Sequence, residues 1–589
     1  MMSSVGSKTC SDFRWQVASR SETAKALASS LKIPVWLAQS LLNRGISSVD
    51  QAAAWFNPLL KSLSDPFLLP NMGIAVERLL RAHAHAERIL LFGDYDVDGI
   101  TSTALLYELL TELGFQVGYY LPNRFGEGYG LSDSAVESCL QEHSPQLLIA
   151  VDCGSSSWEV IRQIQALSID VIVLDHHQPS NPAPPAKALV NPLIDPGTAT
   201  QFGMLCTAGL AFKLAHGLVK QARSLGWSSA TAIDLRKYLD LVALGTVADM
   251  VRIEAENRIL VRAGLARLSN TERVGLTALK AVAGCMENIG TSHISFQLAP
   301  RLNAAGRLQH AQASLELLLE KDPARARTLA EFLDLQNKER QTIEAQIVHE
   351  VIGAIRKEFD PKNDYVIVQG EDQWHVGVVG IVAAKVLREF HRPTIILGKD
   401  GDRWRGSGRS IDGFDLAAAL RECNDQLLQH GGHAMAAGLS MDPTRLVEFR
   451  SRFNQVAKSK LDLEELRPLL KADSEVHLHE LSLASFDLLS QFEPHGLGNP
   501  EVHLIARNLS VTDFRRMGKE QQHARFYVRE GDFKTQVVWW RCPAGIELPD
   551  EIDLLFTPGT NIYNGTASLQ LTLRDWKAST RITQQVPLT

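Results

Sequence analysis

The sequence lacks the features of exported and membrane-spanning proteins. Its seven cysteines are scattered along 589 residues without CxxC spacing, which argues against a disulfide framework and against a thiolate zinc site. The N-terminal segment has no basic stretch followed by an apolar core, and no apolar run reaches the length that crosses a bilayer. We therefore expect a cytoplasmic protein with no membrane span.

An excess of positive charge is also missing. The chain has 60 Lys and Arg residues against 67 Asp and Glu residues, a formal net charge of −7, so its global charge does not indicate a polyanionic partner. If the substrate is a nucleic acid, positive charge must be concentrated locally. Hydrophobic residues make up 45% of the chain and charged residues 22%, as in folded proteins, and the length requires several domains.

Segments with different hydrophobic patterns follow one another along the chain. From Arg88 onward, apolar runs of strand length alternate with helical stretches, which predicts βαβ units and a mostly parallel sheet. A charged segment with helical spacing follows, then a second α/β pattern, and finally short alternating runs typical of a small barrel. The expected fold class is multidomain α/β: a parallel-sheet lobe, a long-helix connector, a second α/β lobe and a C-terminal all-β barrel that resembles an OB fold.

Acidic residues gather where the predicted strands end. Strand-like runs at 89–93, 147–151 and 170–174 each lead directly into acids, and a later apolar run ends in another. Ligands bind at the carboxyl ends of parallel strands, and carboxylates crowded together repel unless cations neutralise them. A single acid would be explained as a helix cap, but this set predicts a metal centre. Its residues are Asp94, Asp96, Asp98, Asp152, Asp175, His176, His177 and Asp249.

The DxDxDG sequence at residues 94–99 also matches the start of a calcium-binding EF-hand loop. That interpretation fails on two counts. The twelfth position, counted from Asp94, is Leu105 where a bidentate Glu is needed, and the preceding run is strand-like rather than helical. Oxygen and imidazole ligands together suit Mn²⁺ or Mg²⁺.

Four segments that contain these residues resemble, in order, the motifs of the DHH phosphoesterase superfamily. They are GDYDVDGITSTALL, AVDCGSS, LDHH and GTVADM. The resemblance implies hydrolysis of phosphate esters with two divalent ions, Mn²⁺ or Mg²⁺. It assigns metal binding to Asp96, Asp98, Asp152, His176 and Asp249. It leaves Asp94, Asp175 and His177 as candidates for catalytic proton handling or for supporting the ligands, and the small phosphatases of the superfamily have a histidine where this chain has Asp94.

Further segments resemble the RecJ exonucleases of that superfamily and extend the likeness over nearly the whole chain. They are RGISSVDQAAAWFNP, LPNRFGEGYGLS, QLAPRLNAAGRL, GSGRS, GGHAMAAGLS and EPHGLGNPE. The resemblance implies a monomeric 5′-to-3′ exonuclease that degrades single-stranded DNA to 5′-mononucleotides in DNA repair and recombination. A helicase or a single-strand-binding protein is a candidate partner.

This resemblance also suggests how the chain is divided. The expected ranges are 1–75 for a helical lead-in, 76–310 for the DHH catalytic domain, 311–360 for the connector helices, 361–465 for the DHH-associated domain and 466–589 for the OB-like domain.

Arginines and glycines in the RecJ-like segments indicate phosphate binding opposite the metals. Glycines admit close backbone approach and arginines offer forked contacts, so GSGRS predicts an anion cradle; a solvated turn with surface arginines is the alternative. His433 fits either a substrate contact or a core histidine. The residues assigned to substrate binding are Arg124, Arg301, Asn303, Arg307, Ser407, Arg409 and His433. Candidates for base stacking, against a commoner packing role, are Trp404, Phe125 and Tyr129.

Two other classes of function stay open. A small-substrate DHH phosphoesterase, acting on oligoribonucleotides, cyclic dinucleotides or pyrophosphate, would need neither the lead-in nor the barrel. A non-catalytic DNA-binding scaffold would have lost metal-binding residues, whereas the acids and the Asp-His-His motif are present here. Both considerations favour the exonuclease.

Overall fold

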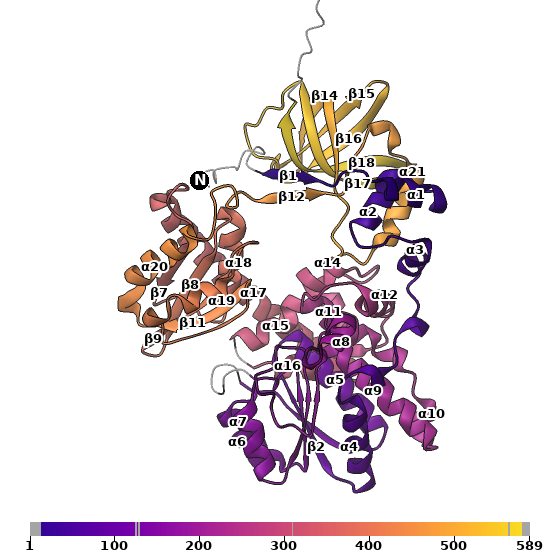
Figure 1. The fold of residues 1–589 in the computed structure, drawn as a ribbon, viewed down its shortest axis with the longest axis vertical. Coiled ribbons are helices and arrows are strands. Elements are labelled where there is room, and N and C mark those ends of the chain that lie inside the picture. Colours follow the sequence, from indigo (N-terminus) through magenta and orange to yellow (C-terminus); the bar gives the residue numbers. More distant parts are fainter. Residues whose placement is uncertain (1–12, 124–126, 128–129, 309, 564–565, 580–589) are drawn as a thin grey trace, which may run out of the picture.

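Two α/β lobes, a long helix and a β-barrel make up the structure (Figure 1). The structure is a computed structural model that describes residues 13–123, 127, 130–308, 310–563 and 566–579. The expected multidomain α/β class is confirmed. No single helix in these ranges has both the length and the apolar character of a membrane span, and α8 (Pro196–Phe202) and α9 (Thr207–Ser224) meet that test only as a pair bent by 101°.

The first lobe is built on a fully parallel five-stranded sheet in the order β3-β2-β4-β5-β6. Its three central strands coincide with the predicted runs and are buried almost completely, as expected for strands covered by helices on both faces. The strands are β2 (Arg88–Gly93), β3 (Gln116–Tyr120), β4 (Leu147–Val151), β5 (Asp170–Leu174) and β6 (Ala188–Val190).

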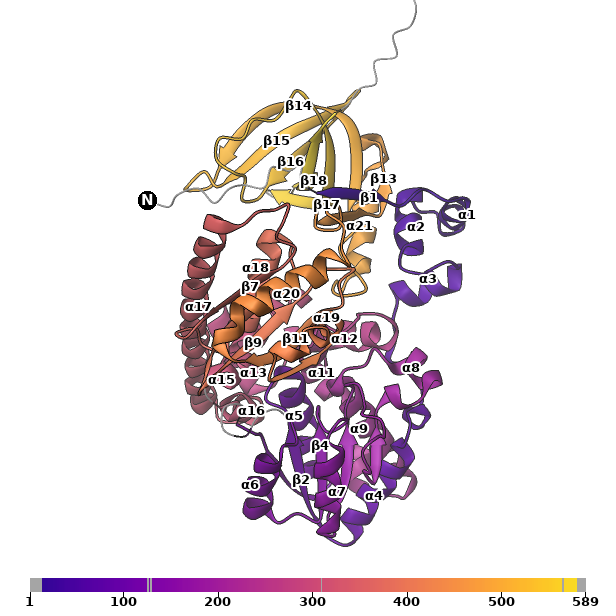
Figure 2. The same ribbon diagram turned by 60° about the vertical axis from the view of Figure 1, so that its left-hand side comes forward.

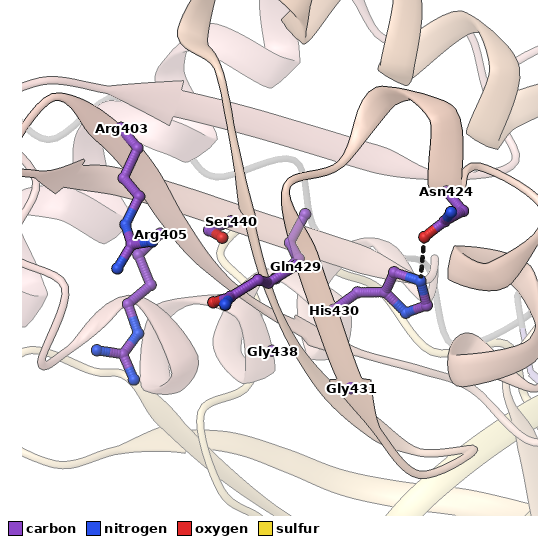
Figure 3. Close-up of a pocket in the computed structure, with 9 residues that line it drawn as sticks. Arg403, Arg405, Asn424, Gln429, His430, Gly431, Gly438 and Ser440 are labelled. Carbon is purple, nitrogen blue, oxygen red and sulfur yellow. Dashed lines mark hydrogen bonds between the residues drawn. The ribbon is translucent and has the colours of Figure 1, made fainter. Parts of the chain in front are cut away.

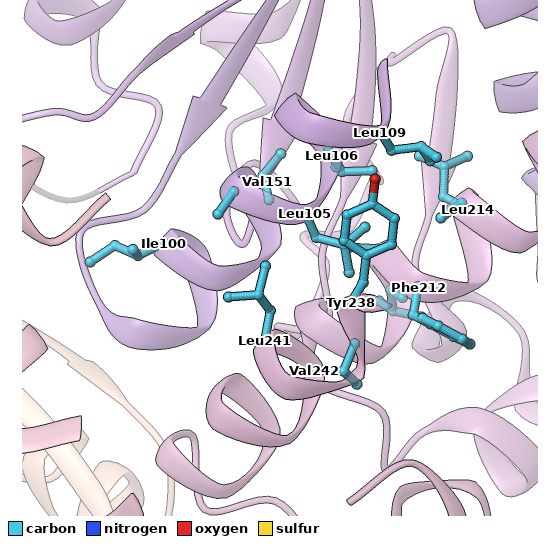
Figure 4. Close-up of a cluster of buried hydrophobic side chains, with 14 of the residues drawn as sticks. Ile100, Leu105, Leu106, Leu109, Val151, Phe212, Leu214, Tyr238, Leu241 and Val242 are labelled. Atoms are coloured by element: carbon cyan, nitrogen blue, oxygen red, sulfur yellow. The ribbon is translucent and has the colours of Figure 1, made fainter. Parts of the chain in front are cut away.

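Alternate strand residues face two separate cores. Ile89 and Leu91 pack with helices on one face, while Leu90 and Phe92 pack with α6 and α7 on the other. Figure 4 shows part of the first core, where side chains of α5, α9 and α11 meet Val151 of β4. The helices that cover the sheet are α4 (Met72–Ala84), α5 (Val97–Glu112), α6 (Asp133–His143), α7 (Trp158–Ala166), α9 and α11 (Leu239–Ala248).

Six further helices among the described residues complete the first lobe and lead to the connector. They are α10 (Ser228–Ala232), α12 (Ala255–Ser269), α13 (Val274–Ala283), α14 (Thr291–His293), α15 (Ala299–Leu308) and α16 (Gln312–Leu319).

The predicted long-helix connector is one helix of 36 residues, α17 (Pro323–Glu358). It begins sharply because the Asp322 side chain caps it and Pro323 fits the first turn. At 1.5 Å per residue it is about 54 Å long. It packs on α13 and α15 near its start and on α18 (Val379–Phe390) near its end. Figure 2 shows it running alongside the second lobe, so it joins the two lobes as a rigid spacer.

The second lobe contains a mixed five-stranded sheet in the order β10-β11-β9-β8-β7. Helices α17 and α18 cover one face near β7 and β8, and α19 (Leu416–Arg421) and α20 (Leu446–Lys458) cover the other. The strands are β7 (Ile367–Glu371), β8 (Thr394–Asp400), β9 (Arg403–Arg409), β10 (Gln429–Gly432) and β11 (Ala436–Met441).

The C-terminal sheet closes on itself because β14 pairs with both β15 and β17, which confirms the predicted barrel. A short helix, α21 (Leu483–Leu489), precedes it. The strands are β13 (Ser474–Glu475), β14 (Leu504–Met517), β15 (His523–Glu530), β16 (Phe533–Trp539), β17 (Glu551–Tyr563) and β18 (Thr566–Ala578).

The N-terminal helices share one hydrophobic core with this barrel. Trp36 and Leu37 are fully buried in the same cluster as Phe526 and Phe556. In addition, β1 (Arg14–Val17) pairs in parallel with β12 (Leu469–Ala472), just before the barrel. The two ends of the described chain therefore form one structural unit, which includes α1 (Glu22–Leu31), α2 (Val35–Leu42) and α3 (Val49–Phe56).

A buried arginine ties this unit to the first lobe. Arg258 of α12 is 2% exposed and has no carboxylate partner among the described residues. Its guanidinium instead donates to the carbonyls of Trp55, Phe492 and Gln491 at 3.2, 2.9 and 2.8 Å, and lies 3.9 Å from the centre of the Trp55 ring. Removing it would take the donor from the carbonyls of Trp55 and Gln491, whereas the Phe492 carbonyl would keep the hydrogen bond from Asn499 Nδ2.

We predict that Arg258→Ala destabilises the protein by about 3 kcal/mol, since each buried carbonyl that loses its donor costs about 1–3 kcal/mol. Thermal unfolding should show a fall of several degrees in the Tm. Arg262→Ala is the matched control, because Arg262 lies one turn away and donates to a single carbonyl, that of Phe56. Equal losses in the two variants would contradict the role given to Arg258.

Candidate metal centre and substrate cleft

The eight predicted residues meet at the carboxyl edge of the first-lobe sheet. Asp94, Asp152 and Asp175 directly follow β2, β4 and β5, and Asp249 caps the C-terminus of α11. Asp96 caps the N-terminus of α5, where its Oδ1 accepts hydrogen bonds from two backbone N–H groups. Three groups of potential metal ligands result, two of which share Asp152: Asp94, Asp96 and Asp152; Asp152, His176 and His177; and Asp98, Cys206 and Asp249.

The turn before α5 depends on Gly99. A Cβ at this position would lie 2.6 Å from the Asp94 carbonyl oxygen, closer than any side chain tolerates. Asp152 has φ 65°, a left-handed conformation that is unfavourable for a non-glycine residue. Backbone strain of this kind is typical of functional sites and persists only where the surroundings enforce it.

The N-terminus of α9 fixes two of the carboxylates. The backbone N–H groups of Thr207 and Ala208 donate to the two oxygens of Asp98 at 2.7 and 2.8 Å, and the Thr207 hydroxyl donates to Asp152 at 2.8 Å. Thr207 and Cys206 were not predicted from the sequence, because they do not follow a predicted strand and the sequence around them contains no recognisable motif.

Asp175 is surrounded by donors from its own loop and from the loop after β4. Its Oδ1 accepts from the backbone N–H groups of His176 and His177 and from His177 Nδ1, at 2.8, 3.1 and 2.8 Å, and its Oδ2 accepts from the Ser155 N–H. Asn191 also holds the His177 carbonyl at 2.8 Å. These contacts fix the backbone at both histidines and the ring orientation of His177.

His176 lies at the centre of the cluster. Its Nε2 is 3.5 Å from Asp152 Oδ1, 3.5 Å from Asp249 Oδ2 and 3.9 Å from Asp98 Oδ2. Both His176 Nε2 and Asp249 Oδ2 are buried without a hydrogen-bond partner in the described part of the chain. Buried polar atoms seldom stay unsatisfied, and a cation among these atoms would satisfy them. The oxygen and imidazole donors fit Mn²⁺ or Mg²⁺.

The electrostatics of the cluster favour cation binding. Burial raises the pKa of Asp98, Asp152 and Asp249, and repulsion from neighbouring carboxylates raises it further. Burial lowers the pKa of His176 to about 4, helped by the charge of His177, so the imidazole is in its neutral, ligating form. Burial also opposes charge on His177, but its hydrogen bond to Asp175 outweighs burial and raises its pKa to about 9.

The substrate-binding candidates occupy different parts of the structure. Asn303 and Arg307 lie on α15 next to the metal cluster: Asn303 Oδ1 accepts from the Val97 N–H at 3.1 Å, and Gly306 packs on the Tyr95 carbonyl. Arg301 instead forms an ion pair with Asp334 of α17 at 2.9 Å. Its contacts link two helices and do not reach the metal residues. Arg124, Phe125 and Tyr129 lie outside the described residues.

The GSGRS segment lies within and just after β9, the central strand of the second lobe, so the alternative of a solvated turn is excluded. Arg409 donates to Ser407 Oγ at 2.9 Å and forms no ion pair with any described residue. The first turn of α18 approaches both side chains closely, since a Cβ on Gly380 would lie 3.0 Å from Ser407 Oγ. Ser407 and Arg409 therefore form a compact polar cradle with unneutralised positive charge.

A contact between α15 and the segment before α18 connects the metal cluster to this cradle. The Gly377 carbonyl accepts from Arg307 at 3.5 Å, and Gly377 lies two residues before the helix that contacts Ser407. His433 is exposed in the β10–β11 hairpin, which excludes a core histidine. Trp404 is buried and donates to Asp372, so it has a packing role and does not stack on bases.

We predict that Mn²⁺ stabilises the protein more at about pH 8 than at about pH 6. Folding raises the pKa of the buried carboxylates, to about 7 for Asp98 and about 9 for Asp249. Without metal, these groups therefore stabilise the folded state below their unfolded pKa of about 4, and this stabilisation is lost as the pH rises through their folded pKa values. Mn²⁺ binds the ionised forms and should reverse that loss. The measurement is the Mn²⁺-induced rise in Tm at each pH, with Asp152→Asn as the control; equal rises at the two pH values in the wild type would contradict this account.

Family models match three parts of the chain: the DHH family N-terminal domain at residues 88–246, the DHHA1 domain at 363–459 and the RecJ OB domain at 472–575. The single-stranded-DNA-specific exonuclease RecJ of Bacillus subtilis is 33% identical over 572 residues, covering 96% of this chain and 71% of that protein.

Solved structures show the same relationship. Crystal structures of Thermus thermophilus RecJ in complex with Mn²⁺ and with Mg²⁺ match at TM-scores of 0.82 and 0.74 and identities of 29% and 27%. They cover 97% of this chain and 80% and 79% of those chains. The chain therefore belongs to the RecJ family of single-stranded-DNA-specific exonucleases within the DHH superfamily.

Proposed function

We propose that this protein is a metal-dependent exonuclease that hydrolyses phosphodiester bonds of single-stranded DNA from a free 5′ end and releases 5′-mononucleotides. The observation that carries the proposal is the complete set of acids and histidines at one sheet edge, with the Ser407–Arg409 cradle on the neighbouring lobe. A non-catalytic scaffold would not need that set. A small-substrate phosphoesterase would not need the barrel that shares its core with the N-terminal helices.

We assign the binding of two divalent ions, Mn²⁺ or Mg²⁺, to Asp96, Asp98, Asp152, His176 and Asp249. When bound, the ions supply an activated water and stabilise the charge that develops on phosphorus and on the leaving 3′ oxygen. The α9 N-terminus keeps Asp98 and Asp152 in place, and Asp175 holds the proton on His177 Nδ1. His177, 3.9 Å from Asp152, is then the candidate for proton handling, with Asp94 supporting the cluster.

Recognition of the 5′ end is assigned to the cradle. A metal pair alone attacks any phosphodiester presented to it, so an exonuclease needs a feature that recognises an end. A terminal phosphate carries more charge than an internal diester, and the forked guanidinium of Arg409 with the Ser407 hydroxyl suits it. Arg307 lies between cradle and metals. Anchoring the terminus there would hold the first internal diester at the metals. We also assign substrate contacts to Asn303 and His433, and to Arg124, which lies outside the described residues.

The barrel is assigned to the recruitment of long single strands. Arg525, Tyr527, Lys534 and Gln536 line a groove of about 960 Å³ on β15 and β16. Lys534 Nζ lies 4.5 Å from the centre of the Tyr527 ring. An aromatic ring beside positive charge on the strands of an OB-like barrel is the usual surface for binding single strands without sequence preference. We further propose that the enzyme acts as a monomer in the cytoplasm, in DNA repair and recombination, on strands exposed by a helicase or a single-strand-binding protein.

We predict that Asp152→Ala and His176→Ala each reduce hydrolysis of single-stranded DNA a hundredfold or more, since even residues behind metal ligands cost about 10–100-fold. Binding of the strand should persist, because the cradle and the barrel are intact. Turnover and binding are measured on the same labelled oligonucleotide, and Asp487→Ala and His349→Ala at exposed positions are the controls. Turnover near that of the wild type would remove the residue from the metal site.

We predict that Arg409→Ala reduces kcat/KM on 5′-phosphorylated strands by about tenfold to a hundredfold, since a charge-assisted contact contributes about 1.5–3 kcal/mol. The loss should be smaller on 5′-hydroxyl strands of the same length. Arg452→Ala, at an exposed position of the same lobe, should change neither rate. An equal loss on the two substrates would make Arg409 a general strand contact and not an end-recognition residue.

A further inference from the structure

A second polar groove lies on the second lobe, next to the cradle (Figure 3). Its volume is about 790 Å³, in the range of small-molecule sites. Arginines of β9 lie at one end of the view, and His430, hydrogen-bonded to Asn424 at 3.0 Å, lies at the other. The groove is lined by Arg403, Arg405, Gln429, Gly431, Gly438 and Ser440, among others.

Strand register makes this groove continuous with the cradle. Because side chains alternate along a strand, Arg403 and Arg405 share one face of β9 with Ser407 and Arg409. Gly438 pairs directly with Ser407, and Ser440 pairs directly with Arg405. Alternate residues on a strand are about 6.6 Å apart. The groove therefore starts at the residue pair next to the cradle and continues away from Arg409.

The two arginines at one end of the groove, Arg403 and Arg405, are free to bind an anion. Arg403 and Arg405 are exposed. Arg405 has only a 3.9 Å contact with Asp400, and Arg403 forms no ion pair within the described ranges. Two cationic forks on one strand face are suited to a phosphate group.

Ser440 gives independent evidence that the groove holds a ligand. It is 4% exposed, and its hydroxyl has no hydrogen-bond partner in the described part of the chain although it lines the groove. A buried hydroxyl without a partner is uncommon, and a ligand in the groove would supply one. Gln429 pairs with Ser440 across β10 and β11 and offers an amide on the same surface.

The floor of the groove is formed by backbone that no side chain covers. A Cβ on Gly431 would meet no atom within 4 Å, and one on Gly438 would meet only the Gly406 carbonyl at 4.0 Å. These two glycines pair with each other across β10 and β11. Together they leave a flat area without side chains, on which a planar base can lie against the sheet.

We propose that this groove binds a nucleoside 5′-monophosphate and is the site to which the product moves after hydrolysis. Arg403 and Arg405 hold the phosphate, Ser440 and Gln429 donate hydrogen bonds, and the base rests on the glycine floor. This inference rests on the proposed function. Each cycle requires the next terminal phosphate to enter the cradle, so the released nucleotide must leave it, and Arg405 lies one position along the strand face.

The test is binding of deoxyadenosine 5′-monophosphate to the full-length protein, measured by calorimetry in the presence of a chelator so that no metal contributes. The double variant Arg403→Ala/Arg405→Ala should weaken binding at least tenfold, whereas Arg409→Ala and the control Arg452→Ala should not. Deoxyadenosine, which lacks the phosphate, should bind far more weakly. Gly438→Val should lose the nucleotide but keep binding of inorganic phosphate, because it fills the floor and leaves the arginines.

Equal nucleotide binding by the wild type and the double variant, or loss of binding in Arg409→Ala alone, would overturn the proposal. The initial rate on single-stranded DNA gives a second readout: the double variant should keep that rate and should be less inhibited by added nucleotide. A lowered initial rate with unchanged inhibition would place the groove on the substrate path instead. Because the titration needs no catalysis, a failure of the exonuclease proposal would appear separately, as absence of hydrolysis by the wild type.

Discussion

Mutual repulsion among buried carboxylates is the constraint on which the rest of the structure depends. Asp98 and Asp152 are almost fully buried, and the pKa values of Asp152 and Asp249 are raised by burial and by the neighbouring charge of Asp98. Without cations such a cluster is unfavourable at neutral pH. The surrounding donors reduce that cost only in part, since α9 supplies three hydrogen bonds but His176 Nε2 and Asp249 Oδ2 stay without one in the described chain. The fold therefore holds a site that metal ions complete.

The residues that we assign to catalysis and to recognition lie on two lobes joined by the long helix α17. The first lobe provides acids and histidines, and the second provides arginines on one face of a central strand. Contact between Arg307 and Gly377 joins the two sets, while Arg258 ties the first lobe to the unit formed by the N-terminal helices and the barrel. In the assignment we propose, cleavage, end recognition and strand recruitment lie on separate elements, so each can be altered by itself.

The hydrophobic pattern was sufficient to predict the parallel sheet and the acids at its edge, because the length and the burial of a strand can be inferred from a short stretch of sequence. It could not predict that Trp36 packs beside Phe526, since that contact joins residues far apart in the sequence. It also missed Thr207, whose role depends on where the start of α9 lies in space. For Arg301 the sequence predicted a substrate contact, whereas the structure shows an ion pair with Asp334, a residue that the surrounding motif does not indicate. In the structure GSGRS lies on a strand, where Gly406 and Gly408 allow Leu397 and Leu416 to pack closely against the backbone. From the sequence alone, these glycines were assigned to the close approach of a phosphate.

The measurement that tests the central claim most directly is digestion of single-stranded DNA labelled at either end, with Mn²⁺ and with a chelator. The account predicts that a 5′ label is released at once as a mononucleotide, that a 3′ label persists until the strand is nearly consumed, and that chelation or a full complement stops the reaction. Early release of the 3′ label, internal cleavage, or hydrolysis that continues without metal would contradict it.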